Sequence, residues 1–102
     1  MAQVTWTEPA LSDLDAIGDY IALQNPEAAA LLVARIIEHV GQLEAHPESG
    51  SKLAELKRSR YRQIIEPPCR VIYRYDGKVV LVLHVFRSER LLRPGRLRRK
   101  PK

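Results

Sequence analysis

The chain has 102 residues, enough for one domain with a hydrophobic core, and its 45% hydrophobic content argues against an intrinsically disordered protein. A single cysteine, Cys69, excludes an internal disulfide and a cysteine-rich zinc site. Residues 1–50 hold one basic and eight acidic residues, a net charge of −7, whereas residues 51–102 hold sixteen basic and four acidic residues, a net charge of +12. The second half is therefore expected to attract a polyanion, such as nucleic acid or an acidic protein segment.

One strand and two helices are expected in the acidic half. Residues 3–6 alternate like a strand, and Thr7 then caps a helix over about residues 8–23, where leucines and isoleucines recur at helical spacing. Asn25 followed by proline starts a second helix, which ends before Pro47. The short connection predicts an antiparallel helical hairpin.

Three strands are expected in the basic half, over residues 61–65, 70–75 and 78–86, after a helical turn at 52–57. Asp76-Gly77 predicts a type I′ hairpin turn. The pairs that this turn predicts are Tyr75 with Lys78, Tyr73 with Val80, and Val71 with Val82. The apolar run 79–83 predicts a strand buried on both faces.

These elements predict an α+β fold, in which an N-terminal strand and an antiparallel helical hairpin pack on a mainly antiparallel sheet whose last three strands form a meander. Residues 1–94 are expected to be a single domain, and residues 95–102 a mobile basic tail. No apolar run is long enough to cross a bilayer, and no signal peptide is evident. We therefore expect a cytoplasmic protein without a membrane partner.

Four segments in this order resemble the RelE/ParE superfamily of toxins from bacterial type II toxin–antitoxin systems, over about residues 3–94. The segments are VTWTEPALSDL at 4–14, LEAHP at 43–47, RVIYRY at 70–75 with the Asp-Gly turn after it, and VLHVFRSER at 82–90. The resemblance implies one of two activities. RelE-like members cut messenger RNA in the ribosomal A site, whereas ParE-like members inhibit DNA gyrase. In both branches an antitoxin wraps the toxin with its C-terminal segment, and its N-terminal domain usually binds operator DNA.

An RNase needs a group that activates the 2′-hydroxyl, a group that protonates the leaving oxygen, and cations for the developing charge. RelE-like toxins typically take these groups from Arg and Lys on the sheet and from a Tyr or His near the C-terminus. This chain has no tyrosine after Tyr75, and Ile64 stands where a RelE-like lysine is expected. These departures favour a ParE-like gyrase inhibitor with no catalytic site, bound by a ParD-like antitoxin in a hetero-oligomer that contacts operator DNA only through the antitoxin.

Candidate residues follow for each interpretation. The candidates for target binding are Arg62, Arg70, Arg74, Arg87 and Arg90. The candidates for antitoxin binding are Leu31, Leu32, Val33, Ile37 and Tyr73, and the antitoxin is expected to be drawn partly by the charge of the basic half. A RelE-like RNase would instead use Arg70, His84 and Arg87.

A third interpretation is a non-toxic nucleic-acid-binding domain of the same fold, since tyrosines and arginines interleave over residues 60–75. The same pattern is also explained by ordinary strand composition, since tyrosine is favoured in β-sheets. His84 alone is more simply a strand histidine bonded to a neighbour, and His39 and His46 are expected to be solvated or helix-capping. Neither a metal site nor a cofactor is expected.

Overall fold

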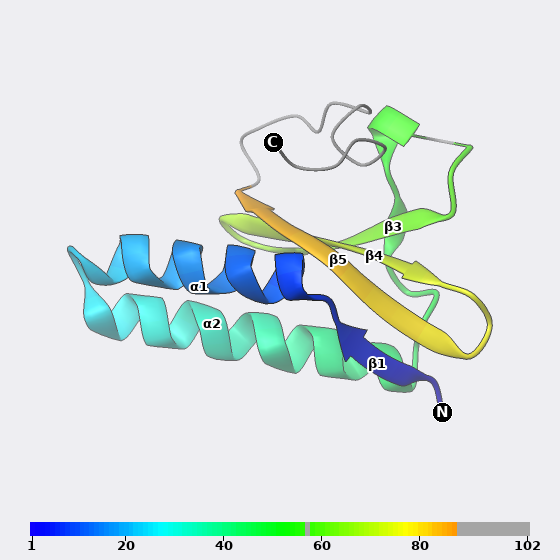
Figure 1. The fold of residues 1–102 in the computed structure, drawn as a ribbon, viewed down its shortest axis with the longest axis horizontal. Coiled ribbons are helices and arrows are strands. Elements are labelled where there is room, and N and C mark those ends of the chain that lie inside the picture. The colour runs from blue at the N-terminus through cyan, green and yellow to red at the C-terminus, as the bar shows by residue number, and fades with distance from the viewer. Residues whose placement is uncertain (57, 88–102) are drawn as a thin grey trace.

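A five-stranded sheet in the order β1-β5-β4-β3-β2 carries a helical hairpin on one face (Figure 1). The computed structural model describes residues 1–56 and 58–87, so the expected tail at 95–102 lies outside the described residues. The strands are β1 Gln3–Trp6, β2 Ser51–Lys52, β3 Tyr61–Glu66, β4 Cys69–Tyr75 and β5 Val79–Arg87. The helices are α1 Glu8–Ala22 and α2 Pro26–Gly41, with short 3-10 turns η1 Gln42–Glu44 and η2 Ala54–Leu56.

Both helices begin at the expected caps. Thr7 Oγ1 accepts a hydrogen bond from the Ala10 N–H at 3.3 Å, and Asn25 Oδ1 accepts one from the Ala28 N–H at 3.0 Å. Each bond satisfies a backbone donor that the first turn of a helix leaves without a partner. The hairpin is therefore positioned by local sequence signals as well as by its apolar face.

The sheet confirms the expected fold class. Strands β3, β4 and β5 form an antiparallel meander, and β1 pairs in parallel with β5. Strand β2 was not anticipated, because Ser51 and Lys52 are too few to show an alternating pattern. These two residues pair with Gln63 and Arg62 at the outer edge of the meander.

The predicted register of the β4–β5 hairpin is wrong. The Asp76 N–H donates to the Val79 carbonyl at 3.3 Å, so the loop residues are Gly77 and Lys78 rather than Asp76 and Gly77. Only Gly77 has a positive φ, of 100°, whereas a type I′ turn needs a positive φ at both central residues. A β-bulge between Ile72 and Tyr73 shifts the pairing once more. The observed pairs are Tyr75 with Val80, Tyr73 with Val82, and Val71 with Val85.

The main core lies between the hairpin and the sheet. Its fully buried members include Ile36 and Val40 from α2, Tyr73 from β4 and Val82 from β5. A smaller cluster of Leu53, Leu56 and Ile72 occupies the opposite face, where η2 covers part of the sheet. Residues 79, 81 and 83 are only half-buried, so the prediction that this run is buried on both faces is wrong. Within residues 1–56 and 58–87, both long helices lie on the other side of the sheet, and η2 is the helical segment on this second face (Figure 1).

Candidate interaction surfaces

The tyrosines and arginines that interleave in the sequence are divided between the two faces of the sheet. Tyr73 is buried against the hairpin, so its neighbour Arg74 faces the opposite way, onto the face here called the open face. Arg74 is exposed there, and its cross-strand neighbours are Tyr61 and Leu81. The open face therefore presents an accessible arginine, Arg74, beside an aromatic and an aliphatic side chain.

Two of the predicted target-binding arginines hold parts of the fold together. The Arg62 Nη1 donates to the Gly50 carbonyl at 2.9 Å and to the Glu48 carbonyl at 3.3 Å. Arg70 is only 7% exposed, and its guanidinium donates to the Gln63 side-chain oxygen at 3.2 Å. Truncation of either arginine would disturb the fold as well as any interface.

The predicted target-binding residues Arg87 and Arg90 come last in the sequence of the five candidates. Arg87 is exposed at the end of β5, with its Cζ 5.3 Å from the centre of the Tyr20 ring on α1, a cation–π geometry. It therefore points toward the hairpin and does not converge with Arg70 and His84 on the open face. Arg90 lies outside the described residues.

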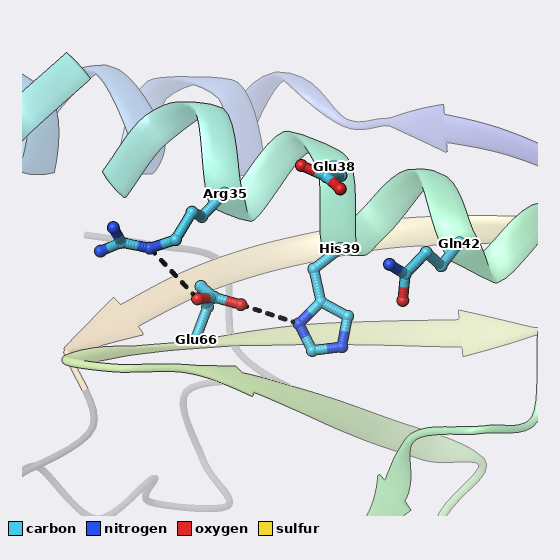
Figure 2. A pocket seen from close by; sticks show the side chains of 5 residues that line it. All are labelled: Arg35, Glu38, His39, Gln42 and Glu66. Atoms are coloured by element: carbon cyan, nitrogen blue, oxygen red, sulfur yellow. Dashed lines mark hydrogen bonds and ion pairs between the residues drawn. The ribbon is translucent and has the colours of Figure 1, made fainter. Parts of the chain in front are cut away.

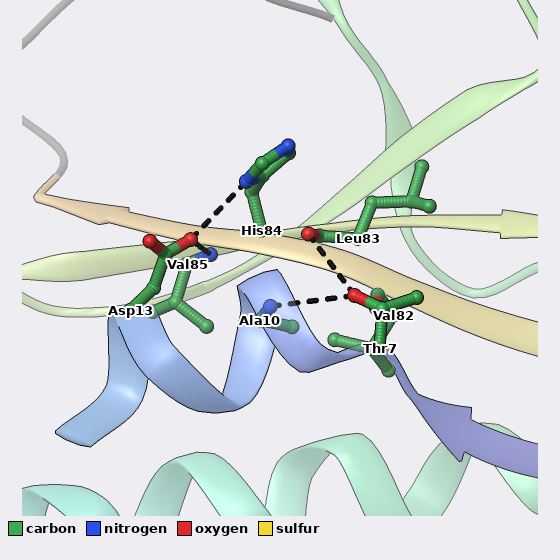
Figure 3. A network of polar contacts seen from close by, with 7 residues as sticks. All are labelled: Thr7, Ala10, Asp13, Val82, Leu83, His84 and Val85. Carbon is green, nitrogen blue, oxygen red and sulfur yellow. Dashed lines mark hydrogen bonds and ion pairs between the residues drawn. The ribbon is translucent and has the colours of Figure 1, made fainter. Parts of the chain in front are cut away.

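His84 has a carboxylate partner that the sequence interpretation missed. Its Nδ1 lies 3.2 Å from Asp13 Oδ2, which also accepts the Val85 N–H at 3.0 Å (Figure 3). The imidazole stacks on Phe86 with ring centres 5.3 Å apart. Asp13 lies on α1 at a position off its apolar stripe, and only the fold brings it to β5. The pair ties the start of α1 to the part of β5 that extends beyond β1.

Tyr73, a predicted antitoxin contact, is fully buried and organises a loop. Its hydroxyl donates to the Pro47 carbonyl at 2.8 Å and accepts the Gly50 N–H at 2.9 Å. Burial raises the pKa of Tyr73 above 10.0, partly opposed by the Gly50 hydrogen bond and the nearby Arg62 charge. Tyr73 contributes to the fold and presents no surface to a partner.

The predicted antitoxin contacts on α2 separate by exposure. Leu31 and Ile37 are 57% and 51% exposed, whereas Leu32 is 3% exposed in the core and Val33 is half-buried. Further exposed apolar side chains were not anticipated on and just after α1, namely Leu11, Tyr20 and Leu23, at 47%, 61% and 83%. Both helices of the hairpin therefore offer exposed apolar side chains to a partner.

A polar pocket of about 330 Å³ lies between α2 and β3, lined by Arg35, Glu38, His39, Gln42 and Glu66. Figure 2 shows Arg35 and His39 converging on Glu66, with Arg35 Nε 3.3 Å and His39 Nδ1 3.1 Å from its two carboxylate oxygens. His39 was expected to be solvated or helix-capping, and it instead joins α2 to the sheet. Residues 1–56 and 58–87 contain no group of acidic, cysteine and histidine side chains suited to a metal ion. Within the same residues, no helix is long and apolar enough to cross a membrane.

Comparison with known proteins covers nearly the whole chain. Residues 4–92 match the family model described as the ParE toxin of the type II toxin–antitoxin system parDE. The putative toxin Y4kP of Sinorhizobium fredii is 37% identical over 88 residues, 84% of this chain and 91% of that protein. Toxin RelE2 of Caulobacter vibrioides is 39% identical over 84 residues, 80% of this chain and 91% of that protein.

Solved structures give the same picture of the fold. A chain of the chromosomal ParDE toxin–antitoxin system of P. aeruginosa superposes with a TM-score of 0.68 and 31% identity, over 85% of this chain and 96% of that chain. A chain of the RelBE2 toxin–antitoxin complex of Mycobacterium tuberculosis superposes with a TM-score of 0.62, over 84% of this chain and 96% of that chain. At 21% identity, the second likeness supports the fold alone.

Proposed function

Because the chain belongs to the ParE toxin family of type II toxin–antitoxin systems, we propose that it inhibits DNA gyrase and so arrests replication and growth. The observation that carries this proposal is the match of residues 4–92 to the ParE model. The 31% identity to the ParDE chain of P. aeruginosa supports the same branch of the RelE/ParE superfamily. The protein acts in the cytoplasm, where gyrase and its DNA are found.

The open face of the sheet is the surface offered to the target. Among the predicted target contacts that the structure describes, Arg74 is both exposed and on this face. Arg62 and Arg70 support it from within, by fixing the 48–50 loop and the β3–β4 ladder. An exposed guanidinium beside Tyr61 and Leu81 suits a protein surface that carries carboxylates near apolar groups.

A cognate ParD-like antitoxin neutralises the toxin in a hetero-oligomer. The similar P. aeruginosa chain comes from a ParDE toxin–antitoxin system, which supports a partner of this kind. The side chains of Leu31 and Ile37 on α2 are exposed in the folded toxin, so they give the antitoxin an apolar surface that the toxin core does not use. Operator DNA is contacted only through the antitoxin.

Gyrase supercoiling of relaxed plasmid tests the target directly, with purified toxin alone and after premixing with the antitoxin co-expressed with it. Inhibition by the toxin and relief by the antitoxin would support the proposal. Full supercoiling at a large molar excess of toxin would contradict it. The variant Arg74→Glu is assayed beside the wild type. It should fold normally and inhibit gyrase less strongly.

A second candidate function is RelE-like cleavage of messenger RNA, and one observation favours it. With Nδ1 bonded to Asp13, the His84 ring is oriented so that Nε2 can accept a proton from a 2′-hydroxyl. Arg70 on β4 lies diagonally opposite His84 on β5 and on the same face of the sheet, whereas Arg87 lies toward the hairpin. The site therefore offers a base and a partly buried cation, without the third predicted residue.

Programmed ribosomes distinguish this candidate from gyrase inhibition. An RNase of this design would cut A-site messenger RNA, and the variants Asp13→Asn and His84→Gln would each reduce the cleavage. Intact messenger RNA with wild-type toxin would exclude it. Growth that continues when expression is induced without antitoxin would instead favour the third interpretation, a non-toxic nucleic-acid-binding domain.

A further inference from the structure

Helix α1 carries four acidic residues and no basic residue, and two of the acids, Asp15 and Asp19, stand where they do not favour the helix. Asp15 and Asp19 are one turn apart on its exposed side, a like-charge pair that destabilises a helix by about 0.2–0.5 kcal/mol. Asp19 also lies in the last turn, where the helix dipole disfavours negative charge and no basic residue compensates it. These two carboxylates are locally unfavourable where they stand.

No ion pair within the described part of the chain offsets them. Among residues 1–56 and 58–87, ion pairs within 4.0 Å join Asp13, Glu48 and Glu66 to basic or imidazole side chains, and neither Asp15 nor Asp19 is among the acids so paired. The nearest basic residue in sequence, Arg35, is engaged with Glu66 on the sheet side of α2. Locally unfavourable residues that persist in a fold usually serve a function.

The same carboxylates line an apolar seam between the helices. The helices are in close contact at Gly18, where an added Cβ would lie 3.3 Å from the Val33 side chain. Leu11 is two turns before Gly18, and Ile37 is one turn after Val33, so helical spacing places both along this seam. Each is about half exposed, at 47% and 51%, which places them on the outer side, away from the sheet. Asp15 and Asp19 continue the line of Leu11 at successive turns.

We infer that this seam receives an amphipathic helix of the antitoxin whose apolar stripe is flanked by lysine or arginine. The antitoxin then reverses charge along its length, basic over the hairpin and acidic over the sheet. Residues 8–41 carry six acidic residues against Arg35, and residues 51–87 carry nine basic against three acidic. Complementary charge on both layers fixes the direction in which the partner wraps the toxin. This reverses the charge first expected of the antitoxin for the part of it that covers the hairpin.

The inference rests on the proposed function for the identity of the partner alone, and a peptide test separates the two. The probes are a synthetic amphipathic helix of roughly 18 residues with leucines at helical spacing and flanking lysines, and a twin with flanking glutamates. Affinity for the full-length chain is measured by calorimetry at low and high salt. We expect the lysine peptide to bind about tenfold more tightly than its twin at low salt, with the difference reduced by salt.

Variants of the toxin place the binding site. Asp15→Asn with Asp19→Asn should remove most of the preference for the lysine peptide. The matched control, Glu27→Gln with Glu44→Gln, changes the net charge equally at exposed positions away from the line of Asp15 and Asp19, and should keep the preference. Asp19→Asn alone should raise the melting temperature of the free toxin while it weakens binding of the lysine peptide. If the Asp19 carboxylate had only a structural role, the same substitution would lower the melting temperature as well as the affinity.

Several results would overturn the inference. They are equal binding of the two peptides, tighter binding of the glutamate twin, no binding of the lysine peptide at about 1 mM, and a preference that survives loss of both aspartates. Self-association of the toxin that Ile37→Asp abolishes, with no binding of the lysine peptide, would assign the seam to a second copy. Because the assay contains no gyrase, failure to inhibit supercoiling would contradict the proposed target and leave the peptide result standing.

Discussion

The helical hairpin and the sheet carry opposite charges and use them in different ways. On the sheet, Arg62 and Arg70 are engaged in internal hydrogen bonds, and Arg74 remains exposed on the open face. On the hairpin, Asp15 and Asp19 make no ion pair among the described residues. A basic residue in this chain is therefore a weak indicator of an interface until its partners are known. These two acids indicate one because they lack ion-pair partners within residues 1–56 and 58–87 and also stand at positions that are unfavourable within α1.

The two layers are joined where their charges meet. Asp13 of α1 contacts His84 of β5, and Glu66 of β3 contacts His39 and Arg35 of α2. Each contact links a helix to a strand that lies far from it in the sequence. Ion pairs and hydrogen bonds at partly exposed sites contribute modestly, about 0–1 kcal/mol each, so the apolar core between the layers remains the main source of stability.

The largest difference in stability should appear when an aspartate is placed on the buried side of α2 and, in a second variant, on its exposed side. Leu32→Asp would bury a carboxylate in a core position that is 3% exposed, and should cost about 4 kcal/mol or more and unfold the domain. Ile37→Asp, at 51% exposure, should change stability by about 0.5 kcal/mol or less and weaken the antitoxin complex. Urea unfolding and antitoxin pull-down measure the two effects. Equal destabilisation would contradict the assignment of Ile37 to the surface.

Two glycines, one in each layer, should respond oppositely to alanine. A Cβ on Gly50 would lie 2.6 Å from both the Gln63 carbonyl and the Tyr73 hydroxyl, so Gly50→Ala should cost about 1–3 kcal/mol. A Cβ on Gly41 would meet nothing within 4 Å, so Gly41→Ala should stabilise α2 by up to about 1 kcal/mol. Thermal unfolding of both variants reports the signs. A stable Gly50→Ala variant would show that the 47–50 loop can move away from Tyr73.

Loss of the Tyr73 hydroxyl should have an effect of similar size to that of Gly50→Ala. Tyr73→Phe leaves the Pro47 carbonyl and the Gly50 N–H without their partner, at about 1–3 kcal/mol. The raised pKa means that the folded state holds the Tyr73 proton more tightly than the unfolded state, whose value is 10.0. This contribution is complete below pH 10 and is lost as the pH rises through the folded-state pKa. Stability measured from pH 8 to 11 should fall less steeply in Tyr73→Phe than in the wild type.

The smallest effect is expected at the exposed β4–β5 turn. Hydrogen bonds from the Val79 and Lys78 N–H groups to the Asp76 carboxylate lower its pKa below 3.8. Asp76 therefore stabilises the fold above that pH, and its contribution is lost as the pH falls through the lowered pKa. Asp76→Ala should lower the melting temperature at pH 7 less than Tyr73→Phe does, and the difference from wild type should shrink near pH 2. An unchanged difference at low pH would assign the effect to the turn backbone.

Local signals in the sequence predicted the fold well because each acts within a few residues. Thr7, Asn25 and the 3.6-residue spacing of apolar side chains sufficed for the hairpin, and alternation sufficed for β3, β4 and β5. The register failed because an Asp side chain can accept N–H bonds within the turn, which moves the loop by one residue. The bulge beside Tyr73 depends on packing between strands and leaves no mark in a single sequence.

Which of the candidate interface residues are exposed was predicted less well, since exposure depends on how the layers pack. Leu31 and Leu32 are adjacent and equally apolar in the sequence, yet one is exposed and the other is buried. The Asp13–His84 pair joins residues 71 positions apart, beyond the reach of any local pattern. The charge asymmetry between the two halves is evident in the sequence, but the partners of individual acids and bases can be identified only in the structure.

The division of roles between the two layers is tested most directly by supercoiling assays on one variant from each layer. With Arg74→Glu, gyrase should remain largely active while the toxin still binds the co-expressed antitoxin. With Ile37→Asp, gyrase should be inhibited as by the wild type, and premixing with antitoxin should no longer relieve the inhibition. If both variants lose inhibition and antitoxin binding together, or if neither loses either, the target and the antitoxin are not recognised by separate layers.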